Sequence, residues 1–316
     1  MTNAKATPKS PKTTYCLTLA VLGPSPTIPI AKARYDELLN VWECIGTMLD
    51  IEESWNDLIQ NYSELEVELL TAGVTTMISD VQGYDEFIDI RSRLSRRVFN
   101  LLQACRAYLD YTDHQLGKFK FADIRTPFNT RRHEAYDNDF GYRFMEALRN
   151  YSQHQGVPMH SLSLSSRWLP RGEELKDLMR NSATGKVSLE KLRSSGFKKA
   201  VLDEVPNEKF LDITDLTRAY LEGLWTVHDT IRVLVKDHIK SCRLTIQAAV
   251  EEYGKINNGK VLGLAAAAMR PDGTMQSHTN IFEDIPNRLD RLSRRNRSLV
   301  NLRRRYVSNE ILGSKA

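Results

Sequence analysis

Residues 84–116 read YDEFIDIRSRLSRRVFNLLQACRAYLDYTDHQL. Apolar side chains recur through this stretch at intervals of three, four or seven positions, which puts them on one face of an α-helix. The members of this stripe are Phe87, Leu94, Val98, Leu101, Cys105 and Tyr108. We therefore predict a long helix from about Tyr84 to Leu116 that buries this face.

A second stretch with the same kind of stripe comes before it, from about Ile30 to Thr71. Near-heptad spacing over this length is typical of helices that pack along each other. The connector contains Gly73, Asp80 and Gly83, which suit a turn. Together the two stretches predict a long antiparallel helical hairpin. A third long helix is expected from about Ile213 to Tyr253.

The remaining helices are expected to be shorter. One runs from about Asp139 to Gln155, where Gly156 and Pro158 would end it. Residues 117–139, just before it, look irregular. The other predicted helices lie near 171–181 and 188–203 and from about Pro286 to Leu312.

Four stretches have strand patterns, namely residues 15–22, 159–167, 261–269 and 274–282. The last two are joined by Pro271-Asp272-Gly273 and read as a hairpin. The predicted fold class is therefore mostly α, a long antiparallel helical hairpin or bundle to which a small antiparallel β-sheet is added. We expect a disordered tail over 1–14, a helical bundle with an N-terminal strand over 15–156, and an α+β remainder over 157–316 packed on the same core.

Composition restricts the class of protein. The chain has 316 residues, 27% of them charged, and a net charge of +4, which permits an anionic partner without requiring one. The four cysteines show no CxxC spacing, so we expect a reduced, cytoplasmic protein without a zinc site. The apolar run at 15–22 follows three lysines but is short and lacks a cleavage site, so a strand is favoured over a secretion signal. No stretch is apolar enough to span a membrane.

The residues that suggest a chemistry are Arg149-Asn150-Tyr151-Ser152-Gln153-His154. An Arg can hold a phosphate, an Asn can orient groups by hydrogen bonds, and a His can move a proton near neutral pH. On a helix, Asn150 and His154 lie one turn apart and can touch. Arg149 points about 140° away from His154, and its long side chain would have to curl toward a shared ligand.

This motif resembles the signature of the HEPN superfamily, an Arg followed by a His after four to six residues, in its sharper form with Asn after Arg. Members are helical proteins, and many are metal-independent ribonucleases of toxin–antitoxin, abortive-infection and other antiviral systems. The resemblance implies Arg149 as the phosphate clamp, His154 as the proton carrier and Asn150 as a supporting polar residue. It also implies a homodimer in which the motifs of two copies meet, and no cofactor. The looser spacing also occurs at Arg232 and His238, where Val233 stands in the place of the Asn and His238 falls on an apolar stripe.

Further residues are candidates for contacting RNA. Arg143 and Tyr151 lie on the same predicted helix as the motif. The last predicted helix carries eight arginines against one acid between 286 and 306, which could track a phosphate backbone. From this group we select Arg294, Arg297, Arg303, Arg304 and Arg305.

The sequence thus favours an HEPN-like endoribonuclease that cleaves RNA by 2′-OH attack and acts as a toxin or antiviral effector. Its expected partners are RNA, a second copy of the chain and possible antitoxin or defence-system proteins. Two alternatives stay open: a non-catalytic helical scaffold or interaction protein, and an RNA-binding protein that uses the arginine-rich helix.

Overall fold

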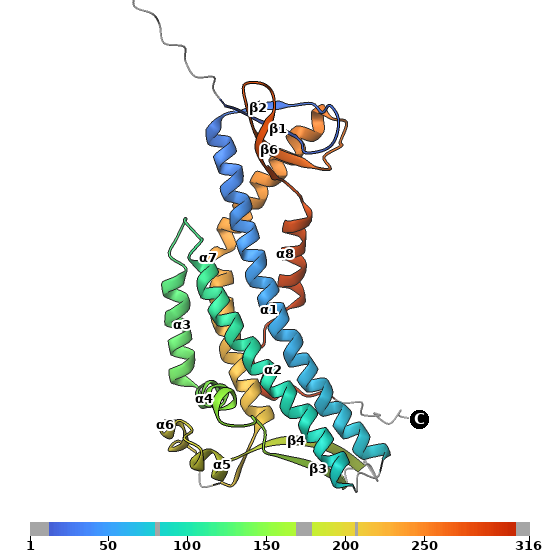
Figure 1. The fold of residues 1–316 in the computed structure, drawn as a ribbon, viewed down its shortest axis with the longest axis vertical. Helices are drawn as coiled ribbons and strands as arrows, with labels where there is room; N and C mark the ends of the chain where they lie inside the picture. Colours follow the sequence, from blue (N-terminus) through green and yellow to red (C-terminus); the bar gives the residue numbers. More distant parts are fainter. Residues whose placement is uncertain (1–12, 80–82, 169–178, 206–207, 308–316) are drawn as a thin grey trace, which may run out of the picture. The chain divides into compact units, whose positions relative to one another are not determined.

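The computed structural model describes residues 13–79, 83–168, 179–205 and 208–307 (Figure 1). The prediction of a mostly helical protein with a small antiparallel sheet is confirmed, since 64% of the described residues are helical. The described residues form eight α-helices and two sheets, one of four strands and one of three. The predicted tail lies outside the described residues except for its last two positions. None of the described helices has the length and apolar character that crossing a bilayer requires.

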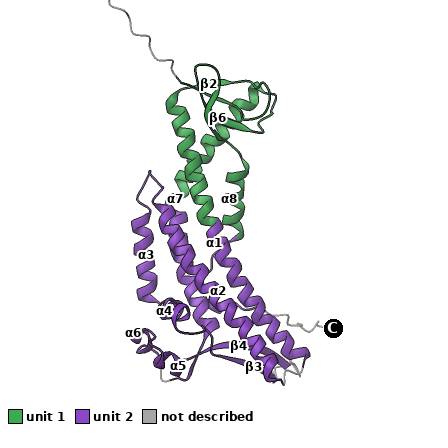
Figure 2. Ribbon diagram, in the orientation of Figure 1, with its two compact units in different colours: residues 1–52, 234–295 green, residues 53–233, 296–316 purple. Residues whose placement is uncertain are grey.

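The chain divides into two compact units (Figure 2). Unit 1 contains residues 1–52 and 234–295, and unit 2 contains residues 53–233 and 296–316. Helices α1 (Lys32–Ile78) and α7 (Ile213–Ile256) each contribute residues to both units. Each unit is therefore built from segments that are far apart in the sequence.

Unit 1 holds the four-stranded antiparallel sheet, in the order β2-β1-β6-β7. Its strands are β1 (Thr14–Leu19), β2 (Ile28–Ile30), β6 (Leu264–Met269) and β7 (Met275–Asn280), so three of the predicted strands are confirmed with shorter bounds. Four consecutive alanines of β6 are buried beside β1. The turn between β6 and β7 uses Gly273 at φ +83°, which glycine adopts without strain.

The last helix of unit 1, α8, spans Asp284–Arg295. The prediction of one helix from Pro286 to Leu312 is therefore wrong. Asn296 follows it as a buried residue, and Asn301 adopts a left-handed conformation before the short 3-10 helix η1 (Leu302–Arg304). The side chain of Asn296 donates to Asn56 of α1, and the hydroxyl of Ser298 accepts from the backbone N–H of Val300, so the arginine-rich stretch does not continue as one helix.

Unit 2 contains the helical hairpin. Helix α2 spans Tyr84–Leu116, as predicted, while α1 runs seven residues beyond the predicted Thr71 and includes Gly73. The ion pairs Glu68–Arg93 and Glu64–Arg97 show that α1 and α2 run antiparallel in this unit. Gly73 is thus a helix residue and does not form the connector, and Asp80 lies outside the described residues.

Aromatic rings fill the centre of unit 2. Trp55 of α1 stacks on His228 of α7, with ring centroids 4.5 Å apart. Tyr108 of α2 meets both rings edge-on, and its hydroxyl is 2.9 Å from Nδ1 of His228. All three residues are buried, so this cluster joins the three long helices in the core of the unit.

Residues 117–139 are not irregular throughout, because α3 spans Arg125–Asn138. This helix buries only Phe128 fully, so it has no apolar stripe to reveal it in the sequence. Asp123 accepts a hydrogen bond from the backbone N–H of Thr126 at 3.0 Å, in the manner of an N-terminal cap. Pro127 is tolerated because it lies in the first turn, where backbone N–H groups have no helical partner.

The three-stranded sheet of unit 2 contains β3 (Ser161–Trp168), β4 (Met179–Ser188) and β5 (Phe210–Asp212), all antiparallel. Strand β3 is confirmed, but it belongs to a different sheet from the other three predicted strands. Residues 179–181 form part of β4 where a helix was expected, and the rest of that expected helix, 171–178, lies outside the described residues. The predicted helix over 188–203 is two short ones, α5 (Leu189–Ser194) and α6 (Lys199–Leu202), separated by Gly196 at φ +70°.

Helix α4 (Phe140–His154) packs closely on α7 through small residues. A Cβ atom added at Gly141 would come within 2.6 Å of the Cβ of Ala219, and one added at Gly223 would come within 2.5 Å of the ring of Tyr142. Each helix therefore supplies a glycine where the other approaches. This contact sets the position of α4 in unit 2.

Substitution of Gly223 by Ala is expected to lower the free energy of unfolding by about 1–3 kcal/mol, because the added methyl has to displace the buried ring of Tyr142. The matched control is Gly46→Ala in α1, where nothing lies within 4 Å of the added Cβ. That change should raise stability by up to about 1 kcal/mol through helix propensity. Urea denaturation measures both, and equal effects of the two changes would contradict the close α4–α7 contact.

Candidate functional site

The helix that carries the Arg149–His154 motif is fixed at both ends. At its start, the side chain of Asp139 accepts a hydrogen bond from the backbone N–H of Tyr142 at 2.7 Å. At its end, the backbone N–H groups of Gln155 and Gly156 both reach the carbonyl of Tyr151. A Cβ at Gly156 would come within 2.4 Å of the Tyr151 hydroxyl, so a glycine is required there. The helix predicted over 139–155 is confirmed.

Arg149 is half-buried and lies one helical turn before Gln153 on α4. One guanidinium nitrogen, Nη1, donates to the side chain of Gln153 at 2.9 Å. The amide of Gln153 in turn donates to Gln103 of α2, also at 2.9 Å. The Nε of Arg149 is buried and has no hydrogen-bond partner among the described residues. The guanidinium is therefore only partly satisfied by the protein itself.

Asn150 and His154 are exposed on another side of the same helix. They lie one turn apart, and neither side chain forms a hydrogen bond within the described part of the chain. Both are thus free to contact a ligand or a second molecule. In that same part of the chain, no hydrogen bond joins Arg149 to His154, in keeping with their angular separation of about 140° on the helix.

The two other candidates on α4 are engaged within the protein. Arg143 forms a two-pronged ion pair with Glu204, with contacts of 3.1 and 2.5 Å, and donates to the backbone carbonyls of Tyr136 and Asp137. Arg143 therefore links α4 both to the end of α3 and to the segment that follows α6. Tyr151 is buried, and its hydroxyl lies 3.2 Å from Nε2 of His160.

His160 connects the end of α4 to the sheet of unit 2. Its Nδ1 accepts the backbone N–H of Ser188 at 3.1 Å, so the proton of the neutral ring is on Nε2, which donates to Tyr151. Burial, followed by the charges of Lys191 and Arg91, holds the pKa of His160 down at about 4. The ring is therefore neutral near pH 7 and has a structural role.

The C-terminal arginines fall into two groups. Arg294 of α8, together with Arg297 and Arg304, has an exposed side chain, although the Nε of Arg294 donates to the carbonyl of Asp290. In contrast, Arg303 pairs with Asp215 through contacts of 2.9 and 2.6 Å. Arg305 donates to the carbonyls of Ser298 and Val300.

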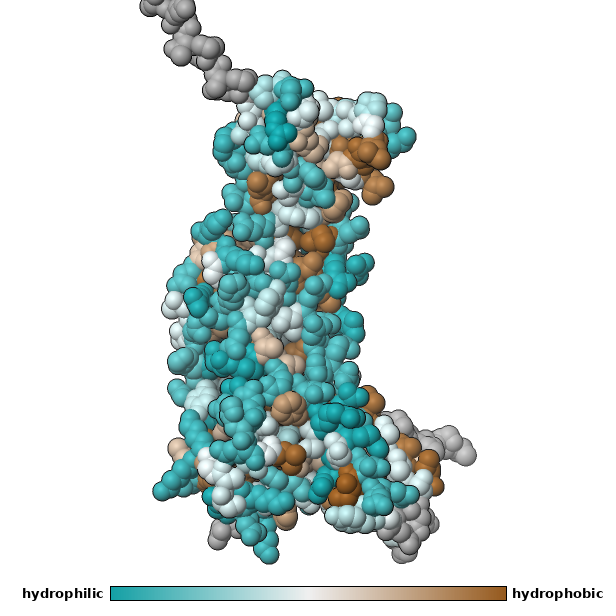
Figure 3. Space-filling model, viewed as in Figure 1, coloured by the Kyte–Doolittle hydropathy of each residue, from teal (hydrophilic) through white to brown (hydrophobic). Residues whose placement is uncertain are grey.

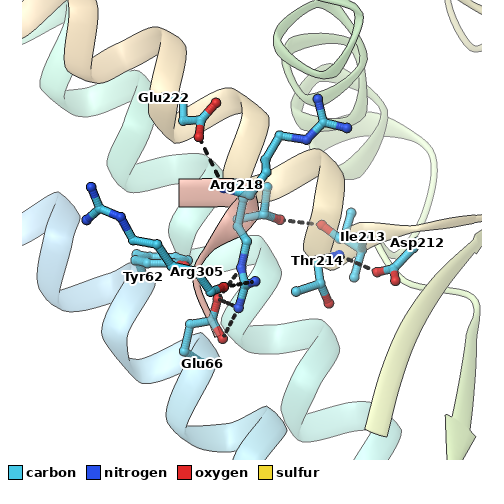
Figure 4. Close-up of polar contacts among 10 residues, drawn as sticks. Tyr62, Glu66, Asp212, Ile213, Thr214, Arg218, Glu222 and Arg305 are labelled. Atoms are coloured by element: carbon cyan, nitrogen blue, oxygen red, sulfur yellow. Dashed lines mark hydrogen bonds and ion pairs between the residues drawn. The ribbon is translucent and has the colours of Figure 1, made fainter. Parts of the chain in front are cut away.

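A network of hydrogen bonds and ion pairs in unit 2 holds the segment around Arg303 and Arg305 (Figure 4). Arg218 of α7 forms a two-pronged pair with Glu66 of α1, at 2.9 and 3.0 Å, and donates to the carbonyl of Arg305 at 2.8 Å. Tyr62 donates to Glu66 at 2.5 Å, and the backbone N–H of Arg303 donates to Glu222. The segment around Arg303 and Arg305 is therefore fastened to α1 and α7.

The looser motif match divides between the two units. Arg232 belongs to unit 2, where it lies over the ring of Trp225, 5.2 Å from its centroid, and donates to the carbonyl of Asn296. His238 belongs to unit 1.

His238 is instead part of a group that the sequence did not reveal. One donor atom each of Cys44, His238 and Cys242 lies within 4.8 Å of the other two. Cys44 is on α1 and the other two are on α7, which explains why no compact motif marks the group. The one local signal is the four-residue spacing from His238 to Cys242, which puts both side chains on one face of a helix.

Two groups of the described residues are therefore candidates for chemistry, the exposed end of α4 in unit 2 and the cysteine–histidine group in unit 1. The surface seen in Figure 3 is mostly hydrophilic, with scattered hydrophobic residues. Comparisons of the chain with protein-family models, with curated proteins and with solved structures found no match.

The neutral state of His160 gives a pH dependence of stability. The unfolded chain takes up a proton on this residue near pH 6.5, whereas the folded protein does so only near pH 4. Stability is therefore fully present above about pH 6.5 and is lost as the pH falls toward 4. The variant His160→Gln cannot titrate, so its stability should decline less steeply over that range in urea denaturation.

The matched control is His133→Gln, which changes an exposed histidine of α3. It should keep the decline of the unchanged protein. Equal slopes for His160→Gln and the unchanged protein would mean that His160 does not link proton uptake to folding.

Proposed function

We propose that this chain is a metal-independent ribonuclease of the HEPN type that acts as a homodimer. The observation that carries the proposal is the state of Asn150 and His154. These two polar side chains are exposed at the end of a well-anchored helix and have no hydrogen-bond partner in the described residues. By contrast, Arg143 and Tyr151 of the same helix are engaged internally. Two of the three motif residues, Asn150 and His154, are thus available to contact RNA, while Arg149 bonds to Gln153.

The proposed reaction uses groups that the substrate and the motif supply. The 2′-OH of RNA attacks the adjacent phosphorus and the bond to the 5′-oxygen breaks. One imidazole accepts the 2′-OH proton, and a second imidazole gives a proton to the leaving oxygen. A guanidinium neutralises the charge that builds on the phosphate. The products carry a 2′,3′-cyclic phosphate and a 5′-hydroxyl, so no water, metal or oxidant takes part.

A second copy of the chain would supply two things that this reaction needs, a second imidazole and a guanidinium close to an imidazole. One His154 cannot readily serve as both base and acid on opposite sides of one phosphate. Arg149 and His154 of one copy also point in different directions on the helix. Pairing of two exposed α4 ends would bring two imidazoles and two guanidinium groups together. Arg149 would then exchange its single bond to Gln153 for bonds to the phosphate, which also offers a partner to its unsatisfied guanidinium.

Surface arginines are the proposed contacts for the rest of the RNA. Arg294, Arg297 and Arg304 are exposed and are the stronger candidates of the C-terminal group. Arg303 and Arg305 are weaker ones, since an ion pair and carbonyl contacts already use them. As a ribonuclease of this type, the protein would act as a toxin or antiviral effector under the control of an antitoxin or defence-system protein.

A non-catalytic role is the second candidate function. The hydrogen bond between Arg149 and Gln153 favours it. If Arg149 keeps this hydrogen bond when RNA is present, its guanidinium cannot clamp a phosphate. A helical scaffold or an RNA-binding protein would then tolerate the loss of His154 without a change in its function.

The test is cleavage of total RNA in the presence of EDTA. The unchanged protein should cleave, and His154→Ala should reduce the rate by about 100-fold to 10,000-fold, the usual contribution of a proton-transferring residue. Arg149→Ala should reduce it by about 100-fold to 1,000-fold through loss of charge stabilisation. His133→Ala, at an exposed histidine away from α4, is the matched control and should keep full activity.

Thermal unfolding should show that all three variants remain folded, because none of the residues changed is in the core. Full cleavage by the His154→Ala variant would reject the proposal. RNA that stays intact with the unchanged protein, yet shifts in a gel, would support the RNA-binding alternative.

A further inference from the structure

Unit 1 brings two thiols and an imidazole together where helices α1 and α7 pack. Cys44 and Cys242 are buried, and His238 is half-buried. Their donor atoms all lie within 4.8 Å of one another. Nothing in the proposed RNA chemistry uses these residues, which belong to a different unit from the α4 motif.

Burial and one hydrogen bond shift the pKa values of the three groups in different directions. A hydrogen bond with Cys242 and burial both raise the pKa of Cys44, so this thiol keeps its proton in the absence of a cation. The same hydrogen bond lowers the pKa of Cys242, which makes its sulfur the readier thiolate. Burial lowers the pKa of His238 and favours the neutral ring, which is the form that binds metals.

We propose that Cys44, His238 and Cys242 bind one thiophilic divalent cation of the Zn²⁺ class. Two sulfur ligands and one imidazole are a set that zinc prefers over magnesium or calcium, which take oxygen ligands. Two thiolates, a neutral histidine and a dication sum to zero charge, which lowers the cost of burying the site. Binding replaces the thiol protons, so these are released to solvent.

The distances fit such a site with small side-chain adjustments. In a tetrahedral zinc site with Zn–S bonds of about 2.3 Å, the two sulfurs are roughly 3.8 Å apart. The donor atoms here, within 4.8 Å of one another, would each have to move by less than about 1 Å to reach that spacing. Because His238 and Cys242 are one helical turn apart on α7, the backbone already holds two of the ligands on one side.

The fourth position of the cation would face a cleft. A hollow of about 420 Å³ is lined by His238 and Cys242 together with polar residues that include Asp36, Asn40 and Ser241. Three protein ligands and an open fourth position are typical of zinc sites that hold a water or a small ligand, whereas structural sites use four protein ligands. The cleft also gives the cation a path to the buried sulfurs.

The experiment is titration of the reduced full-length protein with Co²⁺, which reports thiolate ligands through a charge-transfer band and tetrahedral geometry through its visible bands. The expected result is one Co²⁺ per chain, displaced by Zn²⁺, with affinity that rises with pH because the ligands lose protons. Cys242→Ser, Cys44→Ser and His238→Gln should each weaken binding by at least about tenfold. Cys16→Ser is the matched control, since it removes another buried cysteine of unit 1 and should bind as the unchanged protein does.

X-ray absorption of the zinc-loaded, unchanged protein provides a test that does not depend on the folding of variants. It should show two sulfur neighbours per zinc at about 2.3 Å, with nitrogen or oxygen completing the shell. A shell without sulfur would overturn the proposal, as would Co²⁺ binding that persists in Cys242→Ser. No Co²⁺ binding after full thiol reduction would also overturn it, and a Cys44–Cys242 disulfide in the unreduced protein would then assign the pair to redox chemistry.

Discussion

The close contact between α4 and α7 is the constraint on which the candidate site depends. Gly141 and Gly223 let the two helices approach until the ring of Tyr142 lies against α7. The apolar face of α4 is thereby buried, and Asn150 and His154 are turned to the surface. The bond between Tyr151 and His160 then fixes the last turn, so the polar residues at the helix end are presented by a rigid support.

The parts of the fold that arise from local patterning were predictable. Helix α2 has the predicted bounds because its apolar stripe runs through its whole length and meets a buried core. Helix α3 could not be found in this way, because it buries only Phe128 and is defined by capping and the first-turn position of Pro127. The end of α8 at Arg295 could not be predicted either, because it depends on the burial of Asn296, which is a tertiary property.

The candidate site was predictable in composition and only partly in geometry. Helical periodicity places Asn150 and His154 together and Arg149 apart, and the structure has this arrangement. Periodicity could not reveal the bond from Gln153 to Gln103, because this bond joins α4 to α2. The same reason hid the cysteine–histidine group, whose members come from α1 and α7. Contacts between distant segments leave no periodic signal in a single sequence.

The proposed reaction requires Arg149 and His154 to act on the same phosphodiester. The most direct measurement is a crystal structure of the protein with an RNA oligonucleotide whose 2′-OH groups are methylated, so that it binds but cannot be cleaved. We expect an Arg149 guanidinium and a His154 imidazole within about 3 Å of oxygens on one phosphodiester, at an interface between two copies. An Arg149 still bonded to Gln153, with the RNA bound elsewhere or not at all, would contradict it.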